Sequence, residues 1–334
     1  MIKDDEYYLN KIKNTKFLKE NTKNIYIRSF ETIKEIWGDG KDCKIDTILK
    51  KPDEYYIKLV EYGKNTTSCR LKNKKVSIHT LTNYIAPIIS LFLHNEELKE
   101  SQSELYEKWK ECMDKIRKPV TEKYYSNEPN ERQKDAYISF EELIKMRDKL
   151  EEGSLDRLLL FMYTAIPPVR SDYYKTRIYK IAPKKNIEDT NYIVLNKKPY
   201  IVLNKYKTAK RYKTIIIEIP PELKKEIELS LDKIPRTYLF VSKKTKEPYK
   251  LENTYNRWAN YTLKKITKKP NFSLTMLRHI FLSRKDLKIA DMTAAEKDKI
   301  ANKMGHGIYQ QELYRWIKEL DENDNIVESK DKED

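Results

Sequence analysis

The sequence predicts a mostly helical fold that carries one small antiparallel β-sheet. Over most of the chain, apolar residues recur at intervals of three and four, which is the period of an amphipathic helix. In the second half, a stretch rich in β-branched residues interrupts this pattern, and the pentapeptide Tyr-Ile-Val-Leu-Asn occurs twice, from Tyr192 and from Tyr200. Two such runs joined by a short polar stretch predict a β-hairpin. A third strand is expected over residues 214–219.

The first third of the chain is expected to form a bundle of helices. Phe30, Ile33 and Trp37 follow helical spacing, and residues 77–94 form the most apolar helix candidate. Nothing in this region suggests catalysis. We therefore assign residues 1–120 to a first, helical domain.

A linker between two domains is predicted over residues 121–137. The stretch contains Pro129, follows Pro119, and has mixed charges without a clear period, which is typical of a connecting segment. A helical pattern restarts after Ser139, which is placed to form a capping box with Glu142. Because 334 residues exceed what one typical core requires, two domains are the natural expectation.

The second domain is expected to span residues 138–320, with helices packed around the small sheet. Residues 321–334 are rich in acidic and polar side chains, and we expect this tail to be disordered. The chain has no run of about 18 apolar residues, so no membrane span is expected. Its first residues are charged and lack an apolar stretch, so we expect no secretory signal.

The charge balance favours a polyanionic partner. The chain has 68 Lys and Arg against 52 Asp and Glu, which gives a formal net charge of +16. Such an excess is typical of proteins that bind nucleic acid. An AT-rich genome also enriches Lys, Asn, Ile and Tyr without any function, so charge alone does not identify the partner.

The sequence contains no motif for a metal or a cofactor. Its three cysteines, Cys43, Cys69 and Cys112, lack metal-ligand spacing, and their odd number favours a reducing compartment. Neither of the common glycine-rich phosphate-binding motifs occurs, and the chain has six glycines in all. We therefore expect neither a metal site nor a cofactor.

Four motifs of the second half carry candidate chemistry. Arg170 follows two prolines in YTAIPPVRSDYY, and Lys207 lies beside a strand turn in NKYKTAKRYK. Arg278 lies near the start of an apolar helix in SLTMLRHIF, and the motif MGHGIYQQELYRW contains His306 and Tyr314. A single arginine is more often solvated or paired in a salt bridge, so the order of the motifs is more informative than any one of them.

This order resembles the tyrosine recombinase (phage integrase) family. Arg, then Lys on a hairpin, then Leu-Arg-His-x-Phe, then Gly-His and Tyr cover residues 138–317 at the level of motifs. The helical first third resembles the core-binding domain of that family in its pattern. The resemblance implies an α+β catalytic domain that breaks and rejoins DNA through a 3′-phosphotyrosine, without metal, ATP or another cofactor. Type IB topoisomerases share the catalytic fold, which leaves DNA relaxation open as an alternative.

The resemblance also implies a role for each residue of the motifs. Arg170 and Arg278 would clamp the oxygens of the scissile phosphate, since guanidinium groups bind phosphate through paired hydrogen bonds. Tyr314 would attack the phosphorus, and Lys207 would protonate the leaving oxygen as general acid. His306 would bond to the same phosphate or assist the proton transfer.

Two departures from the family pattern concern the same site. The position three residues before Arg278 is usually His, and here it is Thr275, whose hydroxyl donates to phosphate but does not shuttle protons near neutral pH. The family's nucleophile usually lies one residue further from its Gly-His than Tyr314 lies from His306. Tyr309 is the competing nucleophile, but it lies only three residues after His306. An inactive DNA-binding relative is therefore a further alternative.

Supporting residues are expected around this set. Asp172 would orient a catalytic basic group, or else begin a helix, and His279 would be buried in a supporting role. Four cations of the hairpin region are expected to contact backbone phosphates, and the first of them is also the alternative general acid: Lys205, Lys210, Arg211 and Lys213.

The same resemblance implies the partners and the location. We expect double-stranded DNA as substrate and a homo-oligomer, a tetramer on paired sites, in which a helix over residues 312–320 docks on a neighbouring subunit. The protein would be intracellular, wherever its DNA is: the cytoplasm of a prokaryote, or a nucleus or virus factory.

Overall fold

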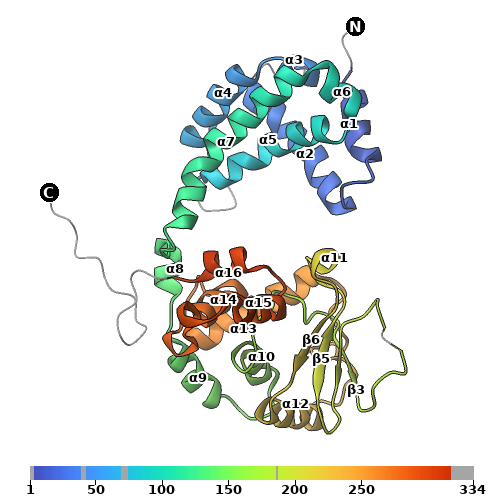
Figure 1. Cartoon of the computed structure of the whole chain (residues 1–334), viewed down its shortest axis with the longest axis vertical. Coiled ribbons are helices and arrows are strands. Elements are labelled where there is room, and N and C mark those ends of the chain that lie inside the picture. The colour runs from blue at the N-terminus through green and yellow to red at the C-terminus, as the bar shows by residue number, and fades with distance from the viewer. Residues whose placement is uncertain (1–3, 39–42, 69–73, 186, 317–334) are drawn as a thin grey trace, which may run out of the picture. The chain divides into compact units, whose positions relative to one another are not determined.

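The computed structural model describes residues 4–316, apart from 39–42, 69–73 and 186 (Figure 1). The chain divides into two compact units, Met1–Ser126 and Asn127–Asp334, each with its own core. None of the helices within the described ranges is long and apolar enough to cross a membrane.

The first unit is helical, as predicted. Helix α5 packs against α2 and α7, and these contacts form the centre of the bundle. Its elements are α1 (Asp5–Asn14), α2 (Glu20–Trp37), α3 (Ile45–Leu49), α4 (Pro52–Asn65), β1 (Thr67–Ser68), β2 (Lys74–Lys75), α5 (Ile78–Leu93), α6 (Glu96–Ser101) and α7 (Ser103–Tyr125).

The helices of this unit form where the sequence pattern places them. Phe30, Ile33 and Trp37 are all buried on one side of α2. This helix ends at Gly38, which adopts a left-handed conformation with φ 94° that glycine reaches without steric cost. The Ser77 hydroxyl caps α5 by accepting a hydrogen bond from the Thr80 N–H.

The segment 121–137, which we expected to be a linker, contains helical structure at both ends. Helix α7 continues through Pro119 to Tyr125, and the boundary between the two units follows Ser126. Helix α8 (Glu131–Ala136) begins with a capping box, in which Asn130 and Gln133 exchange side-chain to backbone hydrogen bonds. The prolines hid the end of α7 and the whole of α8 in the sequence pattern.

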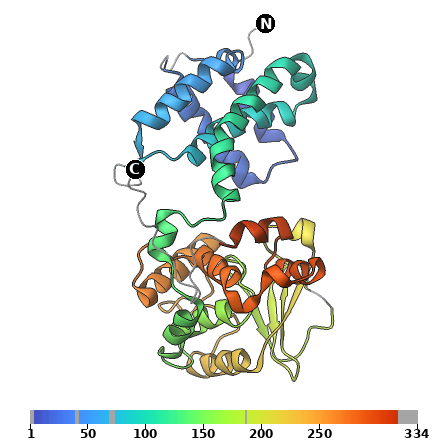
Figure 2. The same cartoon turned by 60° about the vertical axis from the view of Figure 1, so that its left-hand side comes forward.

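The second unit places helices beside one sheet (Figures 1 and 2). Its helices after α8 are α9 (Phe140–Asp148), α10 (Leu155–Thr164), α11 (Ala209–Tyr212), α12 (Pro221–Lys233), α13 (Glu252–Thr267), α14 (Leu274–Ser283), α15 (Ala294–Lys303) and α16 (Ile308–Tyr314), with short 3-10 turns at Lys285–Leu287 and Ile289–Asp291. Its strands are β3 (Arg177–Tyr179), β4 (Tyr192–Val194), β5 (Tyr200–Leu203) and β6 (Ile215–Glu218).

The sheet confirms the predicted hairpin and corrects the predicted topology. Strands β4 and β5 are antiparallel with Ile193 opposite Ile201, and β6 pairs antiparallel with β5 as the third strand. However, β3 pairs in parallel with β4, placing Ile178 beside Ile193, so the sheet is mixed rather than antiparallel. Three residues are too few to show an alternating pattern, which is why β3 was missed.

Two helices of this unit are buried almost all round. Every residue of α10 from Leu158 to Thr164 is buried, and α10 contacts α9, α12, α13 and α14. Helix α14 is likewise buried from Met276 to Ser283, against α10, α13 and α16. The polar side chains of α14 from Arg278 to Ser283 therefore lie inside the protein and require partners there.

Candidate active site

The centre of the candidate site is Arg278 on α14, whose side chain is 0% exposed. Its Nη1 donates to the carbonyls of Pro168, at 2.9 Å, and Met304, at 3.1 Å. Nε and Nη2 are both buried, and neither makes a hydrogen bond of normal geometry with a described residue. Burial lowers the pKa of this guanidinium, while the adjacent Tyr314 side chain opposes that fall. A buried cation that keeps two unused donors is suited to bind an anion.

Arg170 brings a second guanidinium to the same region. Two prolines stop the chain from continuing α10, and Arg170 follows them with its backbone N–H donating to Asp172 Oδ2 at 3.0 Å. Its carbonyl accepts a bond of 2.5 Å from the Tyr163 hydroxyl, which fixes this turn. The charge of Arg170 contributes to lowering the pKa of both Arg278 and His306. These two arginines and the histidine therefore share one electrostatic environment.

Asp172 is the acidic member of this group. Burial raises the pKa of its carboxyl, while the Arg170 N–H and the positive charges of Arg170 and Arg278 oppose that rise. The negative charge of Glu252, which accepts a hydrogen bond from the Ser171 hydroxyl, adds to the rise. Asp172 therefore lies among charges of both signs, close enough to both arginines for their charges to act on it.

The Gly-His motif is the end of helix α15. Gly305 has φ 69° and donates to the Asn302 carbonyl, while the His306 N–H donates to the Ala301 carbonyl. This pair of bonds is a Schellman motif, whose left-handed position favours glycine. The motif therefore fixes where His306 leaves the helix.

His306 presents an unprotonated nitrogen to the site. Its side chain is 2% exposed, and Nδ1 lies 3.1 Å from the Gly307 carbonyl. A carbonyl only accepts, so Nδ1 carries the proton and Nε2 keeps its lone pair. Burial first, and then the charge of Arg278, lowers the pKa of His306 to about 3. Its Nε2 is buried and meets no hydrogen-bond partner within the described ranges.

Tyr314, rather than Tyr309, lies with these groups. Tyr314 is half-buried at the end of α16, with its ring centroid 4.9 Å from Arg278 Cζ and 5.7 Å from the His306 ring. Tyr309 lies in the first turn of α16 and is 62% exposed. The shorter spacing between His306 and Tyr314 therefore does not prevent their rings from lying close together.

Lys207 is exposed on the β5–β6 connection, which contains the short helix α11. Both neighbours of Lys207 contact the Gly-His segment. The Thr208 hydroxyl donates to the Gly305 carbonyl at 2.6 Å, and the ring of Tyr206 would lie 3.3 Å from a Cβ placed on Gly305. The backbone that carries Lys207 is therefore attached directly beside His306.

The other predicted cations lie on the same connection and are exposed. Lys205 forms an ion pair of 3.3 Å with Asp189, and the Arg211 guanidinium lies 5.3 Å from the Tyr212 ring centroid. Lys210 and Lys213 are exposed beside Arg211. The β5–β6 connection thus presents several exposed positive charges close in sequence to Lys207.

Thr275 lies apart from the buried set. Its side chain is exposed in the first turn of α14, and it lines a hollow of about 340 Å³ together with Arg132, Asn260 and Lys264. The structure therefore does not place Thr275 with the buried Arg278, three residues further along the helix.

His279 is buried, as expected, and its hydrogen-bond partners differ from those of Arg278. Its Nδ1 lies 2.8 Å from the Tyr314 carbonyl, and its ring stacks on Trp316. Helix α16 ends at Tyr314, Arg315 is extended, and Trp316 is buried against Tyr137 of the same chain. Residues 312–316, which we expected to begin a helix that docks in trans, thus pack in cis as far as Trp316. The rest of that helix and the acidic tail lie outside the described residues.

Sequence reasoning missed several polar residues around this site. Gln311 is 0% exposed with both amide atoms unpartnered among the described residues, and it lies one turn before Tyr314 on α16. Gln311 precedes Tyr314 by three residues, a spacing that places both side chains on the same face of a helix, and this was the signal available in the sequence. Thr208 and Gln133 had no such signal, because their partners lie far away in sequence.

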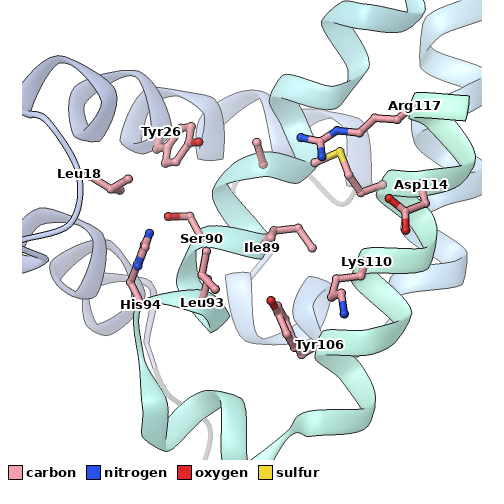
Figure 3. Close-up of a pocket in the computed structure, with 12 residues that line it drawn as sticks. Leu18, Tyr26, Ile89, Ser90, Leu93, His94, Tyr106, Lys110, Asp114 and Arg117 are labelled. Atoms are coloured by element: carbon pink, nitrogen blue, oxygen red, sulfur yellow. The ribbon is translucent and has the colours of Figure 1, made fainter. Parts of the chain in front are cut away.

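The first unit contains a separate cavity of about 320 Å³ between α2, α5 and α7 (Figure 3). Tyr26, Ser90 and Arg117 line it, together with apolar side chains such as Ile89. The Ser90 hydroxyl is buried and has no hydrogen-bond partner within the described part of the chain. No group of three or more His, Cys, Asp or Glu is placed to hold a metal ion in either unit, over the residues described.

Comparison with known proteins finds a likeness among solved structures. A structure described as the crystal structure of XerA recombinase is similar over 94% of this chain and 94% of its own, with 14% sequence identity and a TM-score of 0.39. No protein-family model matches the chain, and no curated protein matches it. Function is therefore inferred from the contacts of Arg278, His306 and Tyr314.

Proposed function

We propose that this protein breaks and rejoins DNA through a covalent 3′-phosphotyrosine at Tyr314, as a tyrosine recombinase does. The observation that carries the proposal is the set of unused polar atoms around Arg278. Nε and Nη2 of Arg278 and Nε2 of His306 are all buried without partners among the described residues, and the Tyr314 ring lies beside both side chains.

A phosphodiester satisfies the two free donors of Arg278. It carries one negative charge and two non-bridging oxygens, which accept hydrogen bonds from these donors. The lone pair of His306 Nε2 remains for a hydrogen-bond donor such as the Tyr314 hydroxyl. Arg170 adds a second positive charge, which stabilises the charge that develops on phosphorus in the transition state. Leaving a buried guanidinium without an anion costs several kcal/mol, so the site favours a bound phosphate.

The proton transfers can be assigned to atoms of the site. Attack forms the bond between Tyr314 Oη and phosphorus and breaks the bond between phosphorus and the 5′ oxygen. The bound phosphate would offset the charges of Arg278 and Arg170 that lower the pKa of His306. His306 Nε2, which holds a lone pair, would then accept the phenolic proton as general base. Lys207 Nζ gives a proton to the departing 5′ oxygen. The reverse steps rejoin the strand, and the ester conserves the bond energy, so ATP is not required.

The substrate in this proposal is double-stranded DNA. Cations on the β5–β6 connection bind backbone phosphates, which positions the duplex without reading its sequence. Recombination on paired sites would require a homo-oligomer, a tetramer, inside the cell that holds the DNA.

The test uses the full chain and a library of duplexes with a randomised core and a nick close to the scissile position. A strand that departs from such a substrate is too short to remain bound, so the covalent complex accumulates. We expect wild type and Tyr309→Phe to form an adduct that survives SDS, and Tyr314→Phe to form none. The reverse pattern would overturn the assignment of the nucleophile.

Two other outcomes would indicate the alternative functions. Relaxation of supercoiled plasmid of any sequence by a monomer would indicate a type IB topoisomerase-like enzyme. Salt-sensitive DNA binding without an adduct on any member of the library would indicate an inactive DNA-binding relative, which the exposed position of Thr275 favours.

A further inference from the structure

His279 connects the end of the nucleophile's helix to helix α8. Its Nδ1 lies 2.8 Å from the Tyr314 carbonyl, and its Nε2 lies 3.3 Å from Gln133 Nε2. Because a carbonyl only accepts, Nδ1 carries the proton and donates it to Tyr314. Nε2 then accepts from the Gln133 amide. These two contacts fix both the tautomer and the plane of the imidazole.

The orientation of Gln133 is set independently. Its Oε1 accepts a bond of 2.8 Å from the Asn130 N–H, as part of the capping box of α8. This bond leaves Nε2 as the amide atom that faces His279. The donor required by the imidazole is thus supplied by a side chain that is itself held in place.

The chain around Tyr314 is attached to α14 at further points. The His279 ring stacks on Trp316, with centroids 4.6 Å apart and an interplanar angle of 12°, and meets the Tyr314 ring edge-on at 4.8 Å. The Trp316 N–H donates to the Ser283 hydroxyl at 2.9 Å. The residues on both sides of Arg315 are therefore fixed to one face of α14.

These contacts matter because Tyr314 is the last residue of a seven-residue helix. The final carbonyls of a helix lack intrahelical partners, and the last turn frays easily. The Tyr314 carbonyl has its partner in His279 instead. The imidazole therefore sets the position of the residue that we propose as nucleophile, where a displacement of about 1 Å lowers a reaction rate by as much as about 100-fold.

We infer that His279 positions Tyr314 for attack on the phosphate, and that Gln133 holds His279 in the orientation this requires. The inference rests on the proposed function. Both ring nitrogens of His279 already have partners, the Tyr314 carbonyl and Gln133, so it acts through Tyr314 and is a positioning residue. It joins the first helix of the second unit to the nucleophile through one side chain.

The test compares substitutions of His279 that retain different parts of its contacts. His279→Asn retains a donor near the position of Nδ1, His279→Gln places its amide near Nε2, and His279→Phe retains the stacking alone. The assays measure the rate of adduct formation at saturating DNA, the Kd for the same DNA, and thermal unfolding of each full-length variant.

We expect His279→Phe and His279→Gln to form the adduct about tenfold or more slowly than wild type, with a Kd within about twofold. His279→Asn is expected to recover most of the rate. Equal rates for Asn and Gln would overturn the inference, and this comparison remains valid if the Phe variant unfolds, because both amides have similar polarity.

A substrate with sulfur at the 5′ bridging position separates positioning from proton donation. A thiol has a pKa of about 8.5, so the thiolate leaves without a general acid. We expect this substrate to restore cleavage by Lys207→Ala but not by His279→Phe, since the His279 defect lies in the attack. Restoration of both would overturn the inference.

The role of Gln133 has a matched control. Gln133→Leu and Asn130→Gly both break the capping box of α8, but only Gln133→Leu removes the contact with His279. We expect slower adduct formation for Gln133→Leu alone, and equal effects would contradict its assigned role. If wild type forms no adduct, the proposed function fails; if it does and the His279 variants match it, the positioning role fails.

Discussion

The guanidinium of Arg278 lies against the ring of Tyr314, with Cζ 4.9 Å from the ring centroid, inside a unit where Arg278 is fully buried. This relationship joins residues 36 positions apart and places a cation beside the hydroxyl that we propose as nucleophile. In the proposed function the same guanidinium would also bind the phosphate, so one side chain would contact both partners of the reaction.

Replacing Arg278 is expected to slow cleavage strongly even when the charge is kept. Arg278→Lys retains one cation but loses the planar fork, so we expect adduct formation to fall about 100- to 1,000-fold, the usual effect of removing a group that stabilises the transition state. Single-turnover adduct formation measures this effect. Arg177→Lys is the control, since Arg177 is exposed on β3. Activity within about twofold of wild type for Arg278→Lys would contradict the proposed phosphate contact.

Stability is expected to decrease as the pH falls below about 6.5. Burial lowers the folded-state pKa of His279 to about 4 and that of His306 to about 3. The unfolded chain therefore binds more protons than the folded chain in this range, and protonation favours unfolding. For His279, a fall from 6.5 to about 4 corresponds to roughly 3 kcal/mol.

The measurement for this prediction is urea unfolding at neutral and acidic pH, followed by hydrogen exchange of the α14 amides. His279→Asn should show a smaller loss of stability on acidification, because one of the two buried imidazoles is gone. An α14 stability that stays constant between pH 7 and pH 4.5 would contradict the buried, neutral state of both histidines.

Gly305→Ala is expected to lower both stability and activity. Gly305 has φ 69°, and an added Cβ would meet the Tyr206 ring at 3.3 Å, so the Schellman turn or the β5–β6 connection must shift. Backbone strain of this kind costs on the order of 1–3 kcal/mol. Thermal unfolding and the rate of adduct formation measure the two effects.

Gly38→Ala is the matched control for Gly305→Ala. Gly38 has φ 94° in the first unit, and its nearest neighbour to an added Cβ is the Lys58 Nζ at 4.0 Å. This variant should lose stability through backbone strain while its adduct formation per folded molecule stays unchanged. A Gly305→Ala variant that cleaves like Gly38→Ala would show that the turn does not position His306.

The cations of α11 and its end are expected to set the affinity for DNA. Replacing Lys210, Arg211 and Lys213 with Gln should weaken binding uniformly across sequences and reduce the slope of log K against log salt concentration by up to about three. Fluorescence anisotropy over a salt series measures both. The control replaces the three exposed lysines of residues 243–246, which removes the same charge elsewhere on this unit. Equal slopes for the two triple variants would contradict a DNA contact at α11.

The sequence predicted those parts of the fold that have strong local patterns. The repeated pentapeptide gave the β4–β5 hairpin because strand periodicity extends over each run. Strand β3 has three residues, and α8 has six and follows Pro129 in a stretch of mixed charge, so neither had enough periodic sequence to be recognised. Whether β3 pairs in parallel depends on the path of the chain after α10, which local pattern does not determine.

The candidate site was predictable as far as its residues lie in short motifs. Arg278, His306 and Tyr314 belong to such motifs, and the structure brings these three side chains together. The contact between Gln133 and His279 spans 146 positions and has no periodic signal, so it required the fold. Thr275 is a residue for which the motif was misleading. Its position three residues before Arg278 suggested a place in the site, but its side chain is exposed and lies apart from the buried residues.

The most direct test of the central claim is to identify the residue that becomes linked to DNA. The adduct formed by wild-type protein is digested with protease and nuclease, and the modified peptide is sequenced by mass spectrometry. We predict a nucleotide joined through its 3′ phosphate to Tyr314. A nucleotide on Tyr309, on another side chain, or on no residue of the chain would contradict the claim.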